Sequence, residues 1–359
     1  MEKGDYQLAN ELVSGIKKFQ SKFGSTVVPS ETKVNLEILY NKVNLFKRLY
    51  PYFMLVGFVF LIILFTKVLH PKKEMTLMTN IIKWLVIGGF VVHAAGLIAR
   101  WYISGHEPWS NGYEAMIYIA WVGILAGILF HKKSPITLAV TSILAGIILW
   151  VANMSWMDPE ITNLVPVLKS YWLTIHVATI VASYGFLALG ALLALVNLIS
   201  MIMRNRDNFI RLDLSIKELT YITEMTLIVG IVLLTIGNFL GGIWANESWG
   251  RYWGWDPKET WAMASIIFYA FILHMRFIPG LRGFYSFNLA ALVGFSSIIM
   301  TYFGVNYYLS GLHSYAKGDP VPVPDFVYYS VAVVALIGIL AFLSERKFKK
   351  AGPGEDQVE

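Results

Sequence analysis

The chain has 359 residues, of which 56% are hydrophobic and only 14% are charged. This composition is too apolar for an ordinary soluble globular protein and indicates an integral membrane protein. The net charge of +6 requires no nucleic acid as a partner, because basic residues gathered at the cytoplasmic edge of a membrane give the same total. The sequence contains no cysteine, which excludes disulfides and a thiol nucleophile of its own.

Nine apolar segments are long enough to cross a hydrocarbon core of roughly 30 Å, which takes about 20 helical residues. We expect these spans at 52–69, 80–99, 114–130, 136–154, 172–203, 221–245, 262–278, 285–309 and 326–343. The expected fold class is therefore an all-α polytopic membrane protein with about nine transmembrane helices and an external tryptophan-rich loop.

The spans divide the chain into three parts. Residues 1–51 form a polar segment that is either a short helix pair or a tether, residues 52–345 form the membrane domain, and residues 346–359 form a tail. Lys and Arg collect in alternate connections, fifteen in one set and five in the other. This bias places the first set and the tail in the cytoplasm, so that residues 1–51 and the tryptophan-rich loop lie outside.

The polar N-terminal segment shows no signal peptide, although it is expected on the outer side. Two explanations stay open. Either the chain is the C-terminal part of a longer protein, or the first span is itself translocated with its N-terminus outward.

Two of the seven histidines lie at the outer ends of their spans. His176 is about one turn into 172–203, and His313 follows 285–309. Both are therefore at the level of the tryptophan-rich loop. Two neutral imidazoles beside an aromatic face suit a bis-histidine haem site, because imidazole binds iron and a porphyrin offers a large apolar surface. A hydrogen bond to a neighbouring helix is the common alternative for a lone membrane histidine.

A third histidine, His274, lies deeper in the membrane. A helix that starts at Ala262 carries His274 roughly 18 Å inward, past the middle of the hydrocarbon core. It cannot share a ligand sphere with the outer pair, so that a functional His274 marks a second, inner site.

The other histidines are explained more simply. For His93, within span 80–99, packing or an interhelical hydrogen bond is favoured over a ligand role. His106 lies in an outer loop, where it either orients substrate or is solvated. His70 and His131 lie beside lysines at cytoplasmic edges, where interface anchoring explains them.

The segment NESWGRYWGWDPKETWA, residues 246–262, concentrates aromatic side chains at one place. Five of the twelve tryptophans fall within eighteen residues, namely Trp244, Trp249, Trp253, Trp255 and Trp261. A membrane-interface belt would spread them around the rim, so this concentration favours a binding face for a flat ligand. Gly250 and Gly254 leave room for close approach, and Arg251 or Lys258 is either the partner of a propionate or a solvated charge.

The acidic residues of this segment have a structural explanation. Asp256 as N-cap, Pro257 at the first helical position and Glu259 two residues later form a capping-box pattern that starts the seventh span. We therefore assign no acid or base catalyst here, and a structural cap is favoured for Asp256.

The stretch WGRYWGWDPKETWA resembles the tryptophan-rich WWD signature of the haem-handling proteins of cytochrome c biogenesis. Its long form is similar to that of the System II cytochrome c synthetase subunit, the CcsA or ResC type. The resemblance extends over most of residues 90–315, including RWYISGHEPWSNGYEAMIYIAW, whose GHxPxxNxYE pattern is similar to the segment upstream of the signature in that family.

This resemblance implies a set of site residues. The two external histidines that hold haem iron match His176 and His313, and the transmembrane histidine of the inner site matches His274. The residues placed against haem b, the transported substrate, are Trp249, Trp253, Trp255, Gly254, Asp256 and Arg251. The other transmembrane histidine of the family comes from the partner half, and His93 is only a weak match for it.

The resemblance also implies a location and partners. It implies a multi-pass protein of the bacterial inner membrane with its WWD loop on the periplasmic face. It implies a CcsB- or ResB-type partner, separate or fused, an apocytochrome c with a CxxCH motif, and thiol-reducing proteins. The activity implied is that of a holocytochrome c synthase-type haem lyase, which works mainly by positioning and protecting its substrate.

Two other functions remain open from the sequence. One is a haem exporter or chaperone of the System I type, which passes haem on without forming thioethers. The other is a membrane b-type cytochrome, which keeps bis-histidine haem permanently as an electron carrier. A membrane scaffold without haem would leave the tryptophan cluster unexplained.

Overall fold

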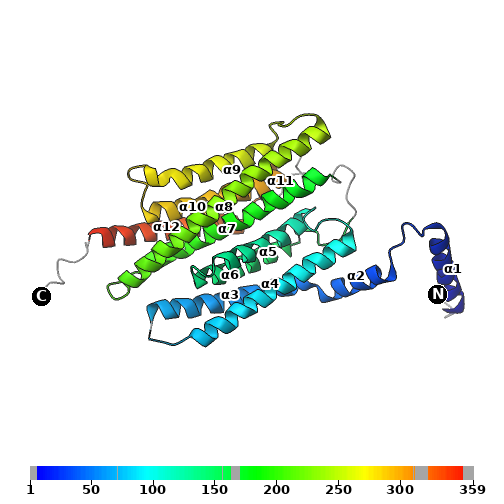
Figure 1. Cartoon of the computed structure of the whole chain (residues 1–359), viewed down its shortest axis with the longest axis horizontal. Helices are drawn as coiled ribbons and strands as arrows, with labels where there is room; N and C mark the ends of the chain where they lie inside the picture. The colour runs from blue at the N-terminus through cyan, green and yellow to red at the C-terminus, as the bar shows by residue number, and fades with distance from the viewer. Residues whose placement is uncertain are drawn as a thin grey trace.

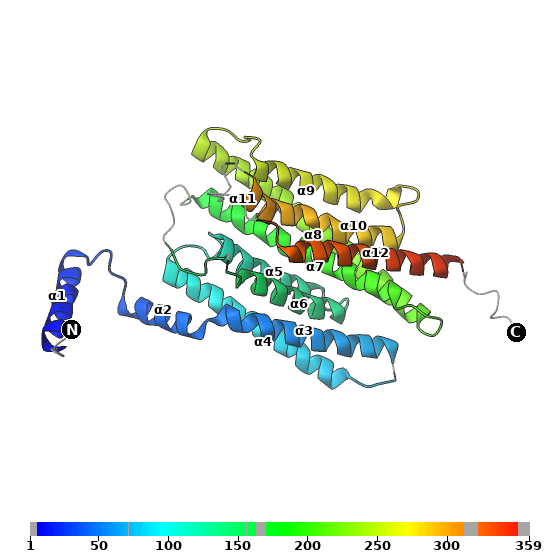
Figure 2. The same cartoon turned by 180° about the vertical axis from the view of Figure 1, so that it is seen from behind.

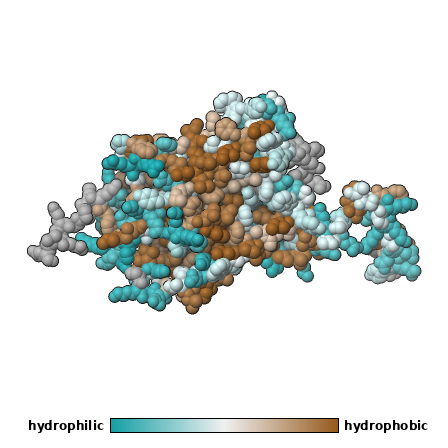
Figure 3. Space-filling model, viewed as in Figure 1, coloured by the Kyte–Doolittle hydropathy of each residue, from teal (hydrophilic) through white to brown (hydrophobic). Residues whose placement is uncertain are grey.

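The computed structural model describes residues 6–70, 72–155, 157–162, 170–309, 311 and 322–350. Every regular element in these ranges is a helix. Nine helices among the described residues are long and apolar enough to cross a membrane, which confirms the fold class and the nine spans expected from the sequence. Figure 3 shows apolar surface gathered over the middle of the bundle and hydrophilic surface towards both ends.

The first four helices form one side of the bundle and an arm beyond it (Figure 1). They are α1 (Tyr6–Phe23), α2 (Glu31–Val43), α3 (Leu45–Leu69) and α4 (Thr76–Ser104). Helix α1 buries no residue and lies away from the bundle, joined to it through α2. The helix-pair alternative for the N-terminal segment is the one found, and α3 begins before the expected boundary at residue 51.

The next four helices include the most buried ones. They are α5 (Gly112–Phe130), α6 (Pro135–Ala152), α7 (Tyr171–Ile202) and α8 (Phe209–Trp249). Helices α7 and α8 share the most extensive interface of the bundle. Glycines make this interface close, because a Cβ added at Gly230 would lie 2.5 Å from Leu187 Cδ2. Small residues allow such backbone approach between membrane helices.

The C-terminal part completes the bundle, with α12 lying across α7 and α10 (Figure 2). Its elements are α9 (Pro257–His274), the 3₁₀ turn η2 (Met275–Phe277), α10 (Phe284–Ile299), the π-helical turn η3 (Met300–Gly304), α11 (Val305–Tyr308) and α12 (Asp325–Lys350). A π-helical turn inside a helix is often found at a functional site.

Several chain reversals meet at one end of the bundle, which we call the tryptophan end. It carries the turns 105–111 between α4 and α5 and 250–256 between α8 and α9, together with the start of α7. The arm formed by α1 and α2 extends beyond this end, and the C-terminus lies at the opposite end.

One sequence expectation was wrong in extent. The span expected at 221–245 belongs to a 41-residue helix, so Trp249 lies in the last turn of α8 and not in a loop. The additional first turns bury Leu212, Ile216 and Leu219. The helix ends where Gly250 adopts φ of 72°, a left-handed conformation that glycine adopts without strain.

Candidate functional site

A cavity opens at the tryptophan end between α7, α8, the first turn of α9 and η3. The turn 105–111 supplies a further wall. Its lining includes His176, Trp109, Trp244, Trp253, Lys258 and Tyr302. An imidazole, three indoles and an ammonium group thus meet around one space, although they come from four different parts of the chain.

The imidazole of His176 is held by the neighbouring helix. Its Nδ1 donates to the carbonyl oxygen of Gly237 on α8 over 2.7 Å. A Cβ added at Gly241 would lie 2.5 Å from Cε1 of this ring, so α8 leaves room for the imidazole only because residue 241 is glycine. A hydrogen bond through one ring nitrogen fixes the tautomer in which the other, Nε2, carries the lone pair that a metal ligand needs.

The tryptophans of the signature occupy two layers. Trp253 lines the cavity, and so does Trp244 of α8. Trp249 packs edge-on against Trp244 with ring centroids 4.7 Å apart, and therefore supports this wall from behind. Trp255 packs edge-on against Trp253 at 5.8 Å and leaves 70% of its surface exposed.

The backbone that presents Trp255 is unusual. Trp255 has φ of 58°, which bulky side chains rarely adopt. The carboxylate of Glu259 brackets it, because Oε2 accepts the N–H of Gly254 at 2.8 Å and of Asp256 at 3.3 Å. The Asp256 side chain in turn accepts the N–H of Lys258. The capping box expected from the sequence is confirmed, and it also fixes the conformation of the tryptophan loop.

The two candidate cations of the loop differ in position. Arg251 does not line the cavity, and its guanidinium fills the space beside Gly254, about 3.1 Å from a Cβ added there. Lys258 lines the cavity, donates from Nζ to Oδ1 of Asn306 at 3.0 Å and lies over the ring of Tyr302. Among the described residues, none of the ion pairs involves Lys258.

Of the two other proposed iron ligands, the structure describes only His274, which lies away from this cavity. His274 is the last residue of α9, exposed, with Nδ1 bonded to the carbonyl of Ala270. Because α9 begins at Pro257 and not at Ala262, His274 lies about 26 Å along the helix, at its far end rather than just past the middle. His313 falls outside the described residues. Gly311, two positions earlier, lies against Asp256 at the tryptophan end.

Comparison with known proteins identifies the family. The profile of the family described as Cytochrome C assembly protein matches residues 109–313, more than half of the chain. The chain belongs to this family. Its site, with His176, the tryptophan loop and the cavity between them, lies within the matched region.

Two relatives show how the chain compares with whole family members. The protein NrfI of Wolinella succinogenes is 48% identical over 315 residues, which cover 87% of this chain but only 34% of NrfI. The cytochrome c biogenesis protein CcsA of Prochlorococcus marinus subsp. pastoris is 36% identical over 309 residues, covering 77% of this chain and 94% of the relative. The chain therefore spans about a third of NrfI and nearly all of this CcsA, and its role lies in cytochrome c biogenesis.

Two further histidines form hydrogen bonds with neighbouring segments. His93 is fully buried, bonds through Nε2 to the carbonyl of Ile117 on α5 at 2.9 Å, and contacts the ring of Phe46. The interhelical hydrogen bond expected for it is confirmed. His106 bonds the carbonyls of Glu107 and Thr162, so that it links two loops at the tryptophan end.

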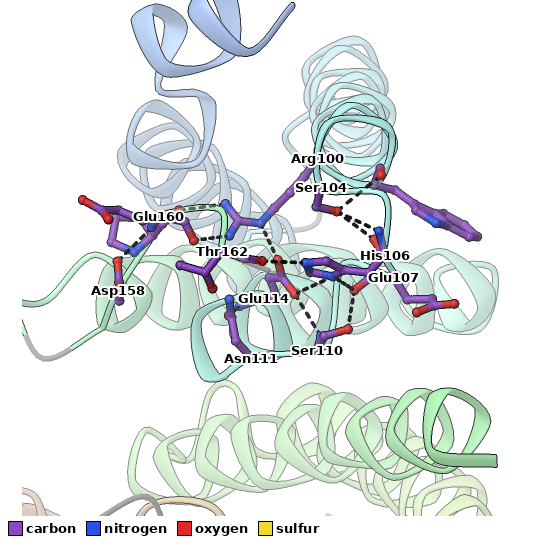
Figure 4. A network of polar contacts seen from close by, with 12 residues as sticks. Arg100, Ser104, His106, Glu107, Ser110, Asn111, Glu114, Asp158, Glu160 and Thr162 are labelled. Carbon is purple, nitrogen blue, oxygen red and sulfur yellow. Dashed lines mark hydrogen bonds and ion pairs between the residues drawn. The ribbon is translucent and has the colours of Figure 1, made fainter. Parts of the chain in front are cut away.

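Sequence reasoning missed three residues near the site. Trp109 lines the cavity, and Arg100 and Glu114 form a fully buried ion pair beside it (Figure 4). All three lie in the stretch that carries the GHxPxxNxYE pattern. That pattern drew attention to the segment, but nothing in it showed that its residues approach the tryptophan loop.

Proposed function

We propose that the chain holds haem b as a substrate in this cavity and presents it for covalent attachment to apocytochrome c. The observation that carries the proposal is the His176 imidazole, which lines a cavity together with three indoles while its Nδ1 donates a hydrogen bond to the Gly237 carbonyl. A preset tautomer and ring orientation suit an iron ligand. Membership of the cytochrome c assembly family supports haem as the ligand.

The walls of the cavity match the parts of haem. The apolar faces of Trp244 and Trp253 suit the macrocycle, and Lys258 supplies a positive charge for a propionate. Trp255 is placed to meet haem or the incoming client from the solvent side, because its ring is exposed and touches Trp253. Trp249 then acts through Trp244, and Arg251, Gly254 and Asp256 shape the loop.

His313 is proposed as the second axial ligand. Support comes from its similarity in position to the second external histidine of the family, and from the packing of Gly311 against Asp256, which brings the chain back to the tryptophan end two residues earlier. His176 and His313 together would protect the iron until the client arrives.

The reaction proposed is that of a holocytochrome c synthase-type haem lyase. The histidine of the client CxxCH motif replaces one axial imidazole, and the two client thiols add across the two vinyl groups. In each addition a C–S bond forms and the thiol proton passes to the other vinyl carbon, with no net oxidation. Both thiols belong to the client, because this chain has no cysteine. The chain contributes binding and orientation.

Haem uptake is proposed from the opposite end of the bundle, near His274. An exposed histidine at the end of α9 suits a site that another protein completes, as expected for a CcsB- or ResB-type partner. The ion pair between Arg276 and Glu224 lies at the same end. On this proposal the tryptophan end faces the periplasm of the bacterial inner membrane, where thiol-reducing proteins keep the apocytochrome reactive.

A haem-transfer assay tests the function. The chain is co-expressed with its partner half and a secreted CxxCH reporter, and covalent haem on the reporter is measured after denaturing electrophoresis. We expect transfer by the wild type, loss in His176→Ala and in His313→Ala, and retention in His131→Ala, whose ring bonds locally to Ile128 at the opposite end. Bound haem that never becomes covalent would instead support an exporter or a b-type cytochrome.

A further inference from the structure

A buried ion pair joins α4 to α5 at the tryptophan end. Arg100 Nε donates to Glu114 Oε1 over 2.8 Å, and both side chains have no exposed surface. Neither residue lines the cavity. Burial of both charges carries a large desolvation cost, and such pairs are weak as sources of stability. The role of this ion pair is therefore to be inferred from the segments that Arg100 and Glu114 hold in place.

Arg100 also binds residues 159 and 160, which follow α6. Its Nη1 donates to the carbonyl of Pro159 at 2.8 Å, and its Nη2 donates to the carbonyl of Glu160 at 3.0 Å. Figure 4 shows the guanidinium between Glu114 on one side and the segment of Asp158 and Glu160 on the other. The rigid fork of an arginine can make these three contacts in one plane, which a lysine cannot.

Glu114 holds the loop that carries Trp109. Its second oxygen, Oε2, accepts the N–H of Ser110 at 2.9 Å, and its own N–H donates to the side chain of Asn111. Ser110 follows Trp109 directly. The carboxylate of the ion pair is therefore one residue away from an indole that lines the cavity.

The indole of Trp109 is fixed at its other end to the helix of the proposed iron ligand. Its Nε1 donates to the carbonyl of Thr174 at 3.2 Å, two residues before His176 on α7. The ring is also packed against Tyr118 of α5, with centroids 4.9 Å apart. Trp109 therefore links the buried ion pair to α7. It is far in the sequence from the tryptophan-rich signature.

We propose that Trp109 is an additional haem-contacting wall of the cavity, and that the Arg100–Glu114 pair is the positioning device that fixes this wall relative to His176. The proposal rests on the proposed function, because it takes haem as the occupant of the cavity. It adds a contact from outside the tryptophan-rich signature, supplied by the turn between α4 and α5.

The absence of cysteine allows a direct test of contact. In Trp109→Cys the new thiol is the only one in the chain, and a thiol held against a haem vinyl adds across it to form a thioether. We expect covalent haem on the chain, co-expressed with a CcsB- or ResB-type protein, after denaturing electrophoresis. The matched control is Trp101→Cys, because Trp101 packs against Trp109 at 6.0 Å but is 48% exposed and does not line the cavity.

The expected result is at least about tenfold more covalent haem in Trp109→Cys than in Trp101→Cys, since small misplacements of reacting groups change such yields by large factors. A second variant at the same position is needed because Trp109→Cys can fail to form an adduct simply by losing haem. Trp109→Phe should shift the visible spectrum of the bound haem, whereas Trp101→Phe should not. Equal amounts of adduct at both positions would overturn the proposal that Trp109 contacts haem. So would the absence of both an adduct in Trp109→Cys and a spectral shift in Trp109→Phe.

The positioning role is tested in the Trp109→Cys background. The paired change Arg100→Met with Glu114→Gln removes both charges together and so leaves no buried charge unpaired. Arg100→Lys keeps the charge but loses the fork. We expect both to reduce the covalent adduct about tenfold while the chain keeps its His176-dependent haem spectrum. The paired control, Arg204→Met with Glu345→Gln, removes a mostly buried ion pair at the opposite end, outside the proposed sites, and should leave the adduct unchanged.

The outcomes separate this inference from the function on which it rests. An unchanged adduct in the Arg100 and Glu114 variants would overturn the positioning role alone. If the haem spectrum depends on His176 but no Trp109 variant changes the spectrum or forms an adduct, the proposal that Trp109 contacts haem is wrong. The proposed function is then unaffected. A wild type whose spectrum is indifferent to His176→Ala would contradict the proposed function itself.

Discussion

The Nδ1 atom of His176 on α7 lies 2.7 Å from the carbonyl oxygen of Gly237 on α8. One turn further along α8, Gly241 leaves the space that the imidazole fills. The orientation of the proposed iron ligand is therefore a property of the α7–α8 interface as well as of the histidine. Changes on α8 that leave His176 in the sequence should still alter the site.

Gly241→Ala should lower the haem content of the purified protein nearly as far as His176→Ala. The added methyl group would lie 2.5 Å from the imidazole, so that the ring must turn away from its hydrogen bond. The visible spectrum of the reduced protein measures this effect. Gly88→Ala is the matched control, because a Cβ at Gly88 meets nothing within 4 Å. Equal haem content in wild type and Gly241→Ala would show that the ring position is unimportant.

Glu259→Ala should loosen the tryptophan loop. The change removes the acceptor of the Gly254 and Asp256 N–H groups, and loss of a helix cap costs about 1 kcal/mol. We expect faster tryptic cleavage at Arg251 in detergent and a lower thermal midpoint. Glu247→Ala is the control, since the exposed Glu247 carboxylate accepts a hydrogen bond from the Ser170 hydroxyl and, among the described residues, does not cap the tryptophan loop. Unchanged cleavage would argue against a role of the carboxylate in holding Trp255.

Lys258→Met should weaken haem retention about tenfold, because a hydrogen bond to a charged group contributes roughly 1.5 kcal/mol. The rate of haem transfer to an excess of apomyoglobin measures it. Arg251→Met, which removes a cation that does not line the cavity, should have a smaller effect. If Arg251→Met released haem faster than Lys258→Met, Arg251 would be the partner of the propionate instead.

His93→Phe should lower thermal stability without changing the haem spectrum. The histidine makes one buried interhelical hydrogen bond, to Ile117, whose loss costs about 1 kcal/mol. Differential scanning fluorimetry and the visible spectrum together provide the measurement. A spectrum altered as strongly as that of His176→Ala would give His93 a ligand role, against its position in the packed interface.

Local patterns in the sequence predicted much of this structure. Apolar segment length was sufficient for the nine spans, and the spacing of Asp256, Pro257 and Glu259 was sufficient for the capping box. The position of His176 at the same end of the bundle as the tryptophan loop followed from its place near the start of a span. In each case the information lies within a few helical turns, where periodicity and capping rules apply.

Contacts between distant segments were not predicted. The Arg100–Glu114 pair links two helices, and its further contacts with 159–160 depend on how the loops fold over α4. The exposure of His274 likewise depends on how α9 packs, which the sequence of α9 alone does not determine. The sequence analysis placed the start of α8 too late, because its first turns alternate charged and apolar residues. The apolar residues of these turns are buried only by packing against other helices.

The visible spectrum of the detergent-purified protein, oxidised and reduced, tests the central claim most directly. It is to be compared among wild type, His176→Ala, His313→Ala and His274→Ala, each co-expressed with the proposed CcsB- or ResB-type partner. The account predicts low-spin bis-histidine haem that either outer substitution perturbs and that His274→Ala lowers in amount. A wild type without haem, or spectra indifferent to all three substitutions, would contradict it.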